Sequence, residues 1–310
     1  MAAPQFGGSW TDRKLAILQR YLKAYLTAMS GHRDRFKLVY VDAFAGTGYR
    51  RVSRLAERSG QTSLFGVETE YEVAQLRDGS ARIALALDSG FDAYIFVECD
   101  RSHCAELLRL QEQRPDARID VRCADANVAL ASIANRPWES WRGVIFLDPF
   151  GMQVNWNTLG SIAGTGALDV WLLVPLSIGP GRMLQKRLSD LDRHPGWRSR
   201  LDAFFGTGAW EAEFFGPNAN SIASGRQGSL FGDQVDEDER YRVDAVNQRL
   251  ASFYIRRLKT IFPFVSEHPR LLRNSRGQPL YMLCFAVANP RPRAAEIALR
   301  IADHVLTAPD

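Results

Sequence analysis

The chain has 310 residues, 46% of them hydrophobic, so it can bury a substantial core in one elaborated domain or in two. Its 39 Lys and Arg residues against 35 Asp and Glu give a formal net charge of +4, which permits a nucleic-acid partner without requiring one. No apolar run approaches the roughly 20 residues of a membrane span, and the N-terminus lacks a charged-then-apolar leader. The sequence therefore favours a cytoplasmic protein.

The first predicted element is a helix over residues 9–30. Thr11 can cap it, and its apolar residues recur at intervals of three and four. These apolar residues are Leu15, Leu18, Leu22, Tyr25, Leu26 and Met29. The remaining positions carry Arg13, Lys14, Arg20 and Lys23, which we interpret as a solvated basic face. The alternative is a helix that lies over a cofactor site and touches phosphates.

The second element is the strand Lys37–Val41, which runs into the segment Asp42–Gly48. Its two glycines let backbone N–H groups approach a ligand that a Cβ atom would exclude. An acid before the glycines repels phosphate and favours a cationic ligand. S-adenosylmethionine carries an ammonium and a sulfonium, so Asp42 can bind its amino group. We assign cofactor binding to Asp42, Ala43, Phe44, Gly46 and Gly48. The alternative is an ordinary strand-to-helix turn.

Strands and helices then alternate, which is typical of an α/β protein with a parallel, doubly wound sheet. The predicted strands are Lys37–Val41, Ala93–Val97, Ala117–Arg122, Gly143–Leu147 and Leu168–Val174, with helical segments such as Ser102–Gln113 between them. At the end of the chain, strand-like Phe262–Leu272 and Pro279–Ala288 flank a turn-rich segment and predict a hairpin. This order predicts a Rossmann-like class I methyltransferase fold, with a seven-stranded, mostly parallel sheet and a C-terminal antiparallel hairpin.

In a doubly wound sheet, ligand-binding groups come from the carboxyl ends of the strands. The second strand ends in Glu98, which is placed to accept both ribose hydroxyls. Asp125 and Ala126 follow the third strand, where the acid can accept the adenine amino group and a backbone N–H can bind the ring. The fourth ends in Asp148. Each acid alone could be a helix N-cap, but polar ends on four strands together favour a cofactor site.

These residues carry a resemblance. The segment Asp42–Gly48 is similar to the cofactor motif of amino-directed nucleic-acid methyltransferases, and Asp148-Pro149-Phe150 resembles their D/N-P-P-aromatic motif. With Gly151, this second motif looks closest to that of tRNA guanine N2 dimethyltransferases. Nearly the whole chain resembles the three-Cys-motif partner proteins. The matching segments are Trp10-Thr11 with Lys14-Leu15, Tyr40–Gly48, Asp125–Asn127, Phe146–Gly151, Asp169–Trp171 and Asn289-Pro290.

That family is named for neighbouring genes that encode cysteine-motif proteins related to phage products, and the resemblance does not supply a reaction. It implies a cysteine-motif protein, of radical-SAM or phage-related type, as a partner. Two features depart from ordinary methyltransferases. About 50 residues separate Gly48 from Glu98, where roughly 20 are usual, and Gly151 replaces a second aromatic residue. The first departure weakens the assignment of Glu98, and the second leaves Phe150 as the one ring for stacking on a flipped base.

We predict one methyltransferase-like domain over residues 1–310, with the N-terminal helix at 9–30 and the hairpin at 261–290. Residues 49–92 form an insertion after the first strand. Residues 177–260 are too long for a simple connection and predict a helical cap, which we expect to set specificity. Within this cap, residues 216–240 are rich in Gly, Ser, Gln and acids and predict a mobile loop.

The expected chemistry is transfer of a methyl group to a nitrogen. Asp148 and the carbonyl of Pro149 can accept the two N–H bonds of an aromatic amine, and Phe150 can hold the ring plane. Methylation at base C5 normally uses a cysteine beside a proline, and no Pro-Cys pair occurs. The four cysteines, Cys99, Cys104, Cys123 and Cys284, lack C-x-x-C spacing, so we expect reduced thiols and no metal site.

The preferred hypothesis is an S-adenosylmethionine-dependent N-methyltransferase that acts on an exocyclic amine of a nucleic-acid base, in DNA or RNA. The alternative is a methyltransferase-like, non-catalytic subunit of a cysteine-motif enzyme in nucleic-acid repair, modification or phage defence. A third possibility is an N-methyltransferase for a small molecule or a protein, which the modest net charge allows.

Overall fold

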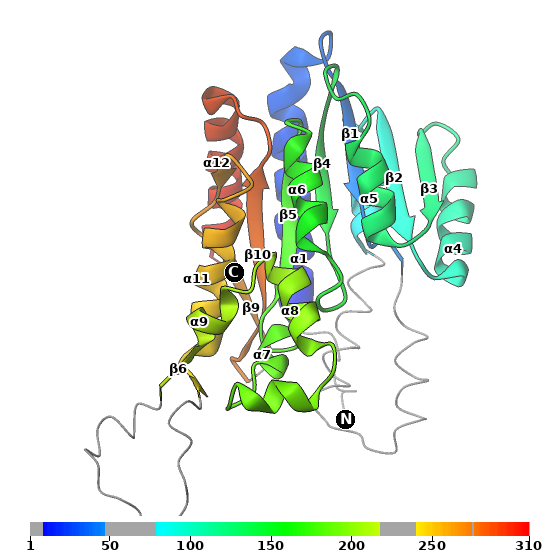
Figure 1. The fold of residues 1–310 in the computed structure, drawn as a ribbon. Coiled ribbons are helices and arrows are strands. Elements are labelled where there is room, and N and C mark those ends of the chain that lie inside the picture. The colour runs from blue at the N-terminus through cyan, green and yellow to red at the C-terminus, as the bar shows by residue number, and fades with distance from the viewer. Residues whose placement is uncertain (1–8, 47–78, 218–239, 275, 310) are drawn as a thin grey trace, which may run out of the picture.

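The computed structural model describes residues 9–46, 79–217, 240–274 and 276–309 (Figure 1). Its core is a sheet in the order β3-β2-β1-β4-β5-β10-β8, with β9 also paired to β10. The first five strands are β1 Lys37–Asp42, β2 Ala93–Glu98, β3 Ile119–Cys123, β4 Trp141–Leu147 and β5 Leu168–Pro175, all mutually parallel where they pair. The last strand, β10 Pro279–Val287, is antiparallel to β5. This Rossmann-like order confirms the predicted fold class.

The terminal hairpin differs from the prediction in one detail. Its first arm is divided into β8 Phe264–Val265 and β9 Arg270–Arg273, both antiparallel to β10, so the sheet has eight strands and not seven. Pro269 lies between them and has no N–H to donate to β10, which interrupts the ladder there.

Helices cover both faces of the sheet, with α5 and α6 in front of it and α1 behind it in Figure 1. Alternate strand residues supply two cores, so that Val39 packs with the α5 face and Tyr40 with the α1 face. The α1 face is covered by α1 Ser9–Met29, helical residues 79–85, α4 Arg101–Glu112 and α12 Pro292–Thr307. The other face is covered by α5 Ala126–Ala134, α6 Trp156–Gly164, α8 Trp197–Phe205, α9 Trp210–Phe214 and α11 Val246–Leu258.

The segment between β5 and β8 holds short elements beside these helices. They are α7 Pro180–Met183, the 3-10 helix Ser189–Arg193, β6 Phe215–Gly216 and β7 Tyr241–Arg242. The strands β6 and β7 pair antiparallel and flank residues 218–239. The predicted mobile loop lies almost wholly outside the described residues, as do Gly48 and most of the predicted 49–92 insertion.

The expectation of four reduced cysteines is wrong for one pair. Cys104 on α4 and Cys123 at the end of β3 form a disulfide, with their Cα atoms 5.8 Å apart. The reason is topological, because α4 leads from β2 to β3 and packs against β3, which brings residues 19 positions apart into bonding range. Cys99 and Cys284 take no part in a disulfide.

Within the described part of the chain, no helix combines the length and the apolar character needed to cross a membrane.

Candidate functional site

The alternation of side chains along β1 and β4 places four residues on the face covered by α1. Tyr40 and Asp42 come from β1, and Phe146 and Asp148 come from the end of β4, which pairs in parallel with β1. Asp42 and Asp148 are both almost fully buried. The two strand ends therefore bring two of the predicted acids to one place beneath the N-terminal helix.

Helix α1 supplies the cation of this cluster. Lys14 Nζ lies 2.6 Å from Asp148 Oδ2, and the two side chains are 0% and 1% exposed. The same ammonium lies 5.3 Å from the centroid of the Phe146 ring. The interpretation of Lys14 as part of a solvated basic face is therefore wrong. Its spacing from Leu18 and Tyr21, four and seven positions on, marks it as a member of the buried stripe and could have revealed this.

Burial raises the pKa of Asp42 to about 7. A hydrogen bond with the Ser80 side chain and one from the Phe44 N–H oppose this rise, and the charge of Asp148 adds to it. The second carboxylate oxygen, Oδ2, is buried and has no hydrogen-bond partner among the described residues. A buried, unsatisfied acceptor of this kind is costly and marks a place for a donor from a ligand.

The loop after β1 is held by its backbone. The Ala43 N–H donates to the Phe146 carbonyl and the Ala45 N–H to the Val97 carbonyl, at 3.1 and 3.0 Å. Ala43 and Phe44 are buried beside these bonds. The loop thus bridges the ends of β4 and β2 and keeps Asp42 and Gly46 in fixed positions.

Gly46 is packed against the end of β2. Its N–H donates to Glu98 Oε2 at 2.9 Å, and a Cβ atom here would lie 2.4 Å from that oxygen and 2.6 Å from the Cβ of His103. A cavity of about 40 Å³ adjoins Gly46 and His103. A glycine is therefore required here by packing within the protein. The predicted role of Gly46 in cofactor binding stays a prediction.

Glu98 has a role that the sequence did not indicate. Besides Gly46, it accepts the Asp100 N–H at 2.9 Å through Oε1, so its carboxylate ties the glycine loop to the end of β2. A carboxylate offers about four lone-pair sites, so these two bonds leave capacity for ribose hydroxyls. Ribose binding by Glu98 stays a prediction.

Asp125 and Phe150 lie at the surface. Asp125 is exposed, and its Oδ1 accepts the N–H groups of Asn127 and Val128 as the N-cap of α5, while Ala126 behind it is buried. Its second oxygen can still take part in adenine recognition. Phe150 is 38% exposed, and its N–H donates to Gln153 Oε1 at 2.8 Å, so its ring is presented outward beside buried Pro149.

The charges of the cluster indicate which ligand it can take. Asp42 and Asp148 carry two negative charges when ionised, and Lys14 carries one positive charge. The remaining negative charge and the unsatisfied Asp42 Oδ2 suit an ammonium and do not suit a phosphate. Within the described ranges, no three His, Cys, Asp or Glu side chains come together as a possible metal site.

A third buried acid lies under α1. Asp169 on β5 accepts a hydrogen bond from the Tyr21 hydroxyl at 2.7 Å, and burial raises the pKa of Asp169 to about 7. A carboxyl group whose pKa is higher in the folded than in the unfolded state stabilises the fold when the pH lies below its pKa in the unfolded state. This stabilisation is lost as the pH rises through its pKa in the folded state.

This gives a pH-dependent prediction. The free energy of unfolding of the wild type should fall as the pH rises from 5 to 8, because Asp169 must ionise in a buried place. In the Asp169→Asn variant this fall should be about 2 kcal/mol smaller, because asparagine has no charge to bury. Urea unfolding at the two pH values measures this. Asp88→Asn, at an exposed position, is the control and should follow the wild type. Equal pH profiles for Asp169→Asn and the wild type would contradict the prediction.

Comparison with known proteins gives remote similarities. No protein-family model matches the chain, and no curated protein is similar to it in sequence. Protein LPL1258 from Legionella pneumophila is 14% identical over 94% of this chain and 92% of its own, with a TM-score of 0.43. Spermidine synthase from Thermotoga maritima is 12% identical over 93% of this chain and 62% of its own, with a TM-score of 0.37.

The putative methyltransferase yhhF from Escherichia coli is 14% identical over 52% of this chain and 70% of its own, with a TM-score of 0.28. At TM-scores below 0.5, these similarities assign no function to the chain, and its fold is defined by the strand order described above.

Proposed function

We propose that this protein is an S-adenosylmethionine-dependent N-methyltransferase whose acceptor is an exocyclic amine of a nucleic-acid base. The observation that carries the proposal is the buried Asp42 carboxylate with an unsatisfied oxygen beside the glycine loop. It stands where the amino group of the methyl donor would bind, at the carboxyl edge of a doubly wound sheet. Glu98 and Asp125, at the ends of β2 and β3, would receive the ribose and the adenine.

S-adenosylmethionine supplies an electrophilic methyl group on a sulfonium. In the proposed reaction the amine nitrogen would bond to this methyl as the sulfur–carbon bond breaks, S-adenosylhomocysteine would leave, and the proton that the nitrogen loses would pass to water. Asp148 and the Pro149 carbonyl would accept the two N–H bonds and direct the nitrogen lone pair at the methyl. Phe150, exposed beside them, would stack on the base.

One observation favours the alternative function, a methyltransferase-like subunit that binds the cofactor without turnover. Asp148 is 1% exposed and bonded to Lys14, so an amine reaches this acid only if the ion pair rearranges. In this second proposal the partner is a cysteine-motif protein, as the resemblance to three-Cys-motif partner proteins implies. Under either function, we propose that the protein is located in the cytoplasm.

Transfer of tritium from methyl-labelled S-adenosylmethionine to DNA, RNA or cell extract distinguishes the two functions. The first predicts label in nucleic acid, with a loss of at least about 100-fold in the Asp148→Asn variant because the amine loses its charged acceptor. Asp116→Asn, at an exposed position, is the control and should keep full transfer. Cofactor binding without transfer, with the cysteine-motif partner present, would support the second function and contradict the first.

A further inference from the structure

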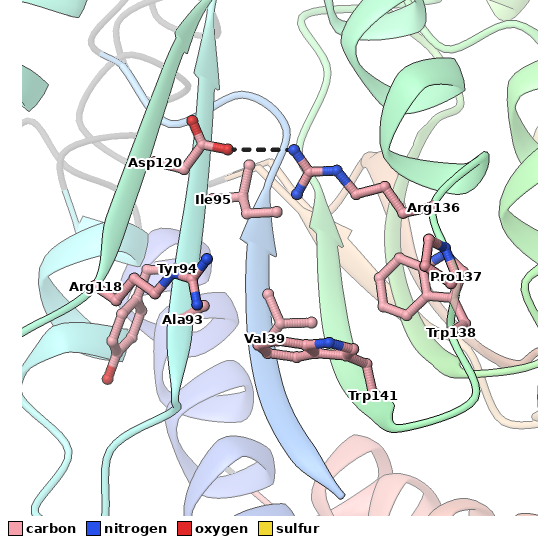
Figure 2. A pocket seen from close by; sticks show the side chains of 10 residues that line it. All are labelled: Val39, Ala93, Tyr94, Ile95, Arg118, Asp120, Arg136, Pro137, Trp138 and Trp141. Atoms are coloured by element: carbon pink, nitrogen blue, oxygen red, sulfur yellow. Dashed lines mark ion pairs between the residues drawn. The ribbon is translucent and has the colours of Figure 1, made fainter.

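A second cavity, of about 250 Å³, lies at the opposite end of the strands (Figure 2). Its floor is formed by Val39 of β1 with Ala93 and Ile95 of β2, near the amino ends of these strands. Helix α5 ends at Ala134, and beyond this end the cavity lies between the floor and the residues that follow the helix. Val39 points to the face opposite that of Asp42, so the sheet separates this cavity from the candidate cofactor site.

Two tryptophans form one wall of the cavity. Trp138 lies on the connection from α5 to β4, and Trp141 is the first residue of β4; the Trp141 N–H donates to the Trp138 carbonyl and closes a tight turn. The indole N–H of Trp138 donates to the Ala134 carbonyl, which fixes this ring. In Figure 2 the Trp138 ring lies beside Pro137, and the Trp141 ring lies next to Val39 of the floor. A fixed indole ring and a second indole beside an apolar floor favour a flat aromatic ligand.

The other residues around the cavity make it basic. Arg118 is exposed at the edge facing the tryptophans and has no ion-pair partner among the described residues. Arg136 reaches across the cavity to Asp120, with 3.7 Å between Nη2 and Oδ2, and Arg122 pairs with the same acid at 3.0 Å. Lys37 Nζ lies over the Trp141 ring, 5.9 Å from its centroid. The cavity is thus lined by two arginines, Arg118 and Arg136, and one carboxylate, Asp120, and this balance leaves net positive charge for an anion.

We propose that this cavity binds one nucleotide unit, with its base against the tryptophans and its phosphate at Arg118. Its volume is slightly below the range of about 300–1,000 Å³ typical of ligand sites, which suits a single nucleotide unit. The unit is either a free nucleotide or the phosphorylated end of a single strand. The proposal is independent of the methyl-transfer function, because none of these residues belongs to the candidate cofactor site.

Calorimetry of the full chain with adenosine 5′-monophosphate tests the proposal. We expect one site per chain, and binding at least about tenfold weaker for adenosine and for inorganic phosphate, each of which lacks half of the contacts. Arg118→Ala and Trp138→Leu should each weaken binding about tenfold, whereas Arg300→Ala, an exposed charge on the distant α12, should change it less than about twofold. Because Arg118 is exposed, its variant stays informative even if Trp138→Leu destabilises the fold.

A 5′-phosphorylated oligoadenylate identifies the source of the nucleotide. Tighter binding than the monophosphate indicates the end of a nucleic-acid strand, and weaker binding indicates a free nucleotide. Saturation with S-adenosylhomocysteine should leave the monophosphate affinity unchanged. The proposal is overturned by no saturable binding, by equal binding of inorganic phosphate, by competition from S-adenosylhomocysteine, or by Arg118→Ala binding as tightly as the wild type.

Discussion

A Lys14→Met variant is expected to unfold with a free energy about 3–5 kcal/mol below that of the wild type. Methionine fills much of the same volume but removes the ammonium 2.6 Å from Asp148, and this leaves an uncompensated carboxylate in a fully buried place. Urea unfolding monitored by circular dichroism at neutral pH measures the loss.

Two further variants make the interpretation specific. Lys23→Met changes an exposed lysine of the same helix and should stay within about 0.5 kcal/mol of the wild type. The double variant Lys14→Met with Asp148→Leu replaces both charges by apolar groups and should regain most of the lost stability. A Lys14→Met protein as stable as the wild type would show that Lys14 is not buried against Asp148.

A Gly46→Ala variant is expected to lose about 1–3 kcal/mol of stability and to bind S-adenosylhomocysteine at least about tenfold more weakly. The added methyl would lie 2.6 Å from the Cβ of His103, which belongs to the rigid first turn of α4, and 2.4 Å from Glu98 Oε2. Either the glycine loop or Glu98 must shift, and both belong to the candidate site.

The matched control is Gly160→Ala in helix α6. No atom lies within 4 Å of a Cβ atom at this position, and alanine is the better helix former, so this variant should gain about 0.5–1 kcal/mol. Thermal unfolding and calorimetry on both variants separate the two glycines. Unchanged stability and unchanged affinity in Gly46→Ala would contradict the close packing of the loop against β2.

Four of the parallel strands could be predicted because each contains an apolar run, and β3 because its apolar and polar residues alternate. All five predicted strands overlap β1 to β5, and all of their ends agree within two residues. The division of the first hairpin arm could not be predicted as firmly, because Pro269 breaks the ladder only where its missing N–H faces a partner strand.

In the candidate site, too, some residues could be predicted from the sequence and others could not. The sequence predicts three of the candidate residues from their position at or just after the ends of apolar strands, because parallel strands end at a common edge. These residues are Asp42, Gly46 and Asp148. The partner of Asp148 could not be identified from the sequence, because Lys14 lies 134 positions away and is one of four cations on the predicted helix. The disulfide and the tryptophan-lined cavity likewise join distant segments that no local pattern connects.

The most direct test of the central claim, that Asp42 and the glycine loop bind a cationic methyl donor, is calorimetry with S-adenosylhomocysteine at two pH values. Because burial raises the pKa of Asp42 to about 7, the wild type should bind about five- to tenfold more tightly at pH 7.5 than at pH 6.0, as the ionised carboxylate accepts the ligand ammonium. Asp42→Asn should bind at least about tenfold more weakly at pH 7.5 and lose this pH dependence, while Asp88→Asn should behave as the wild type. No binding by the wild type, or equal affinities for the wild type and Asp42→Asn at both pH values, would contradict the claim.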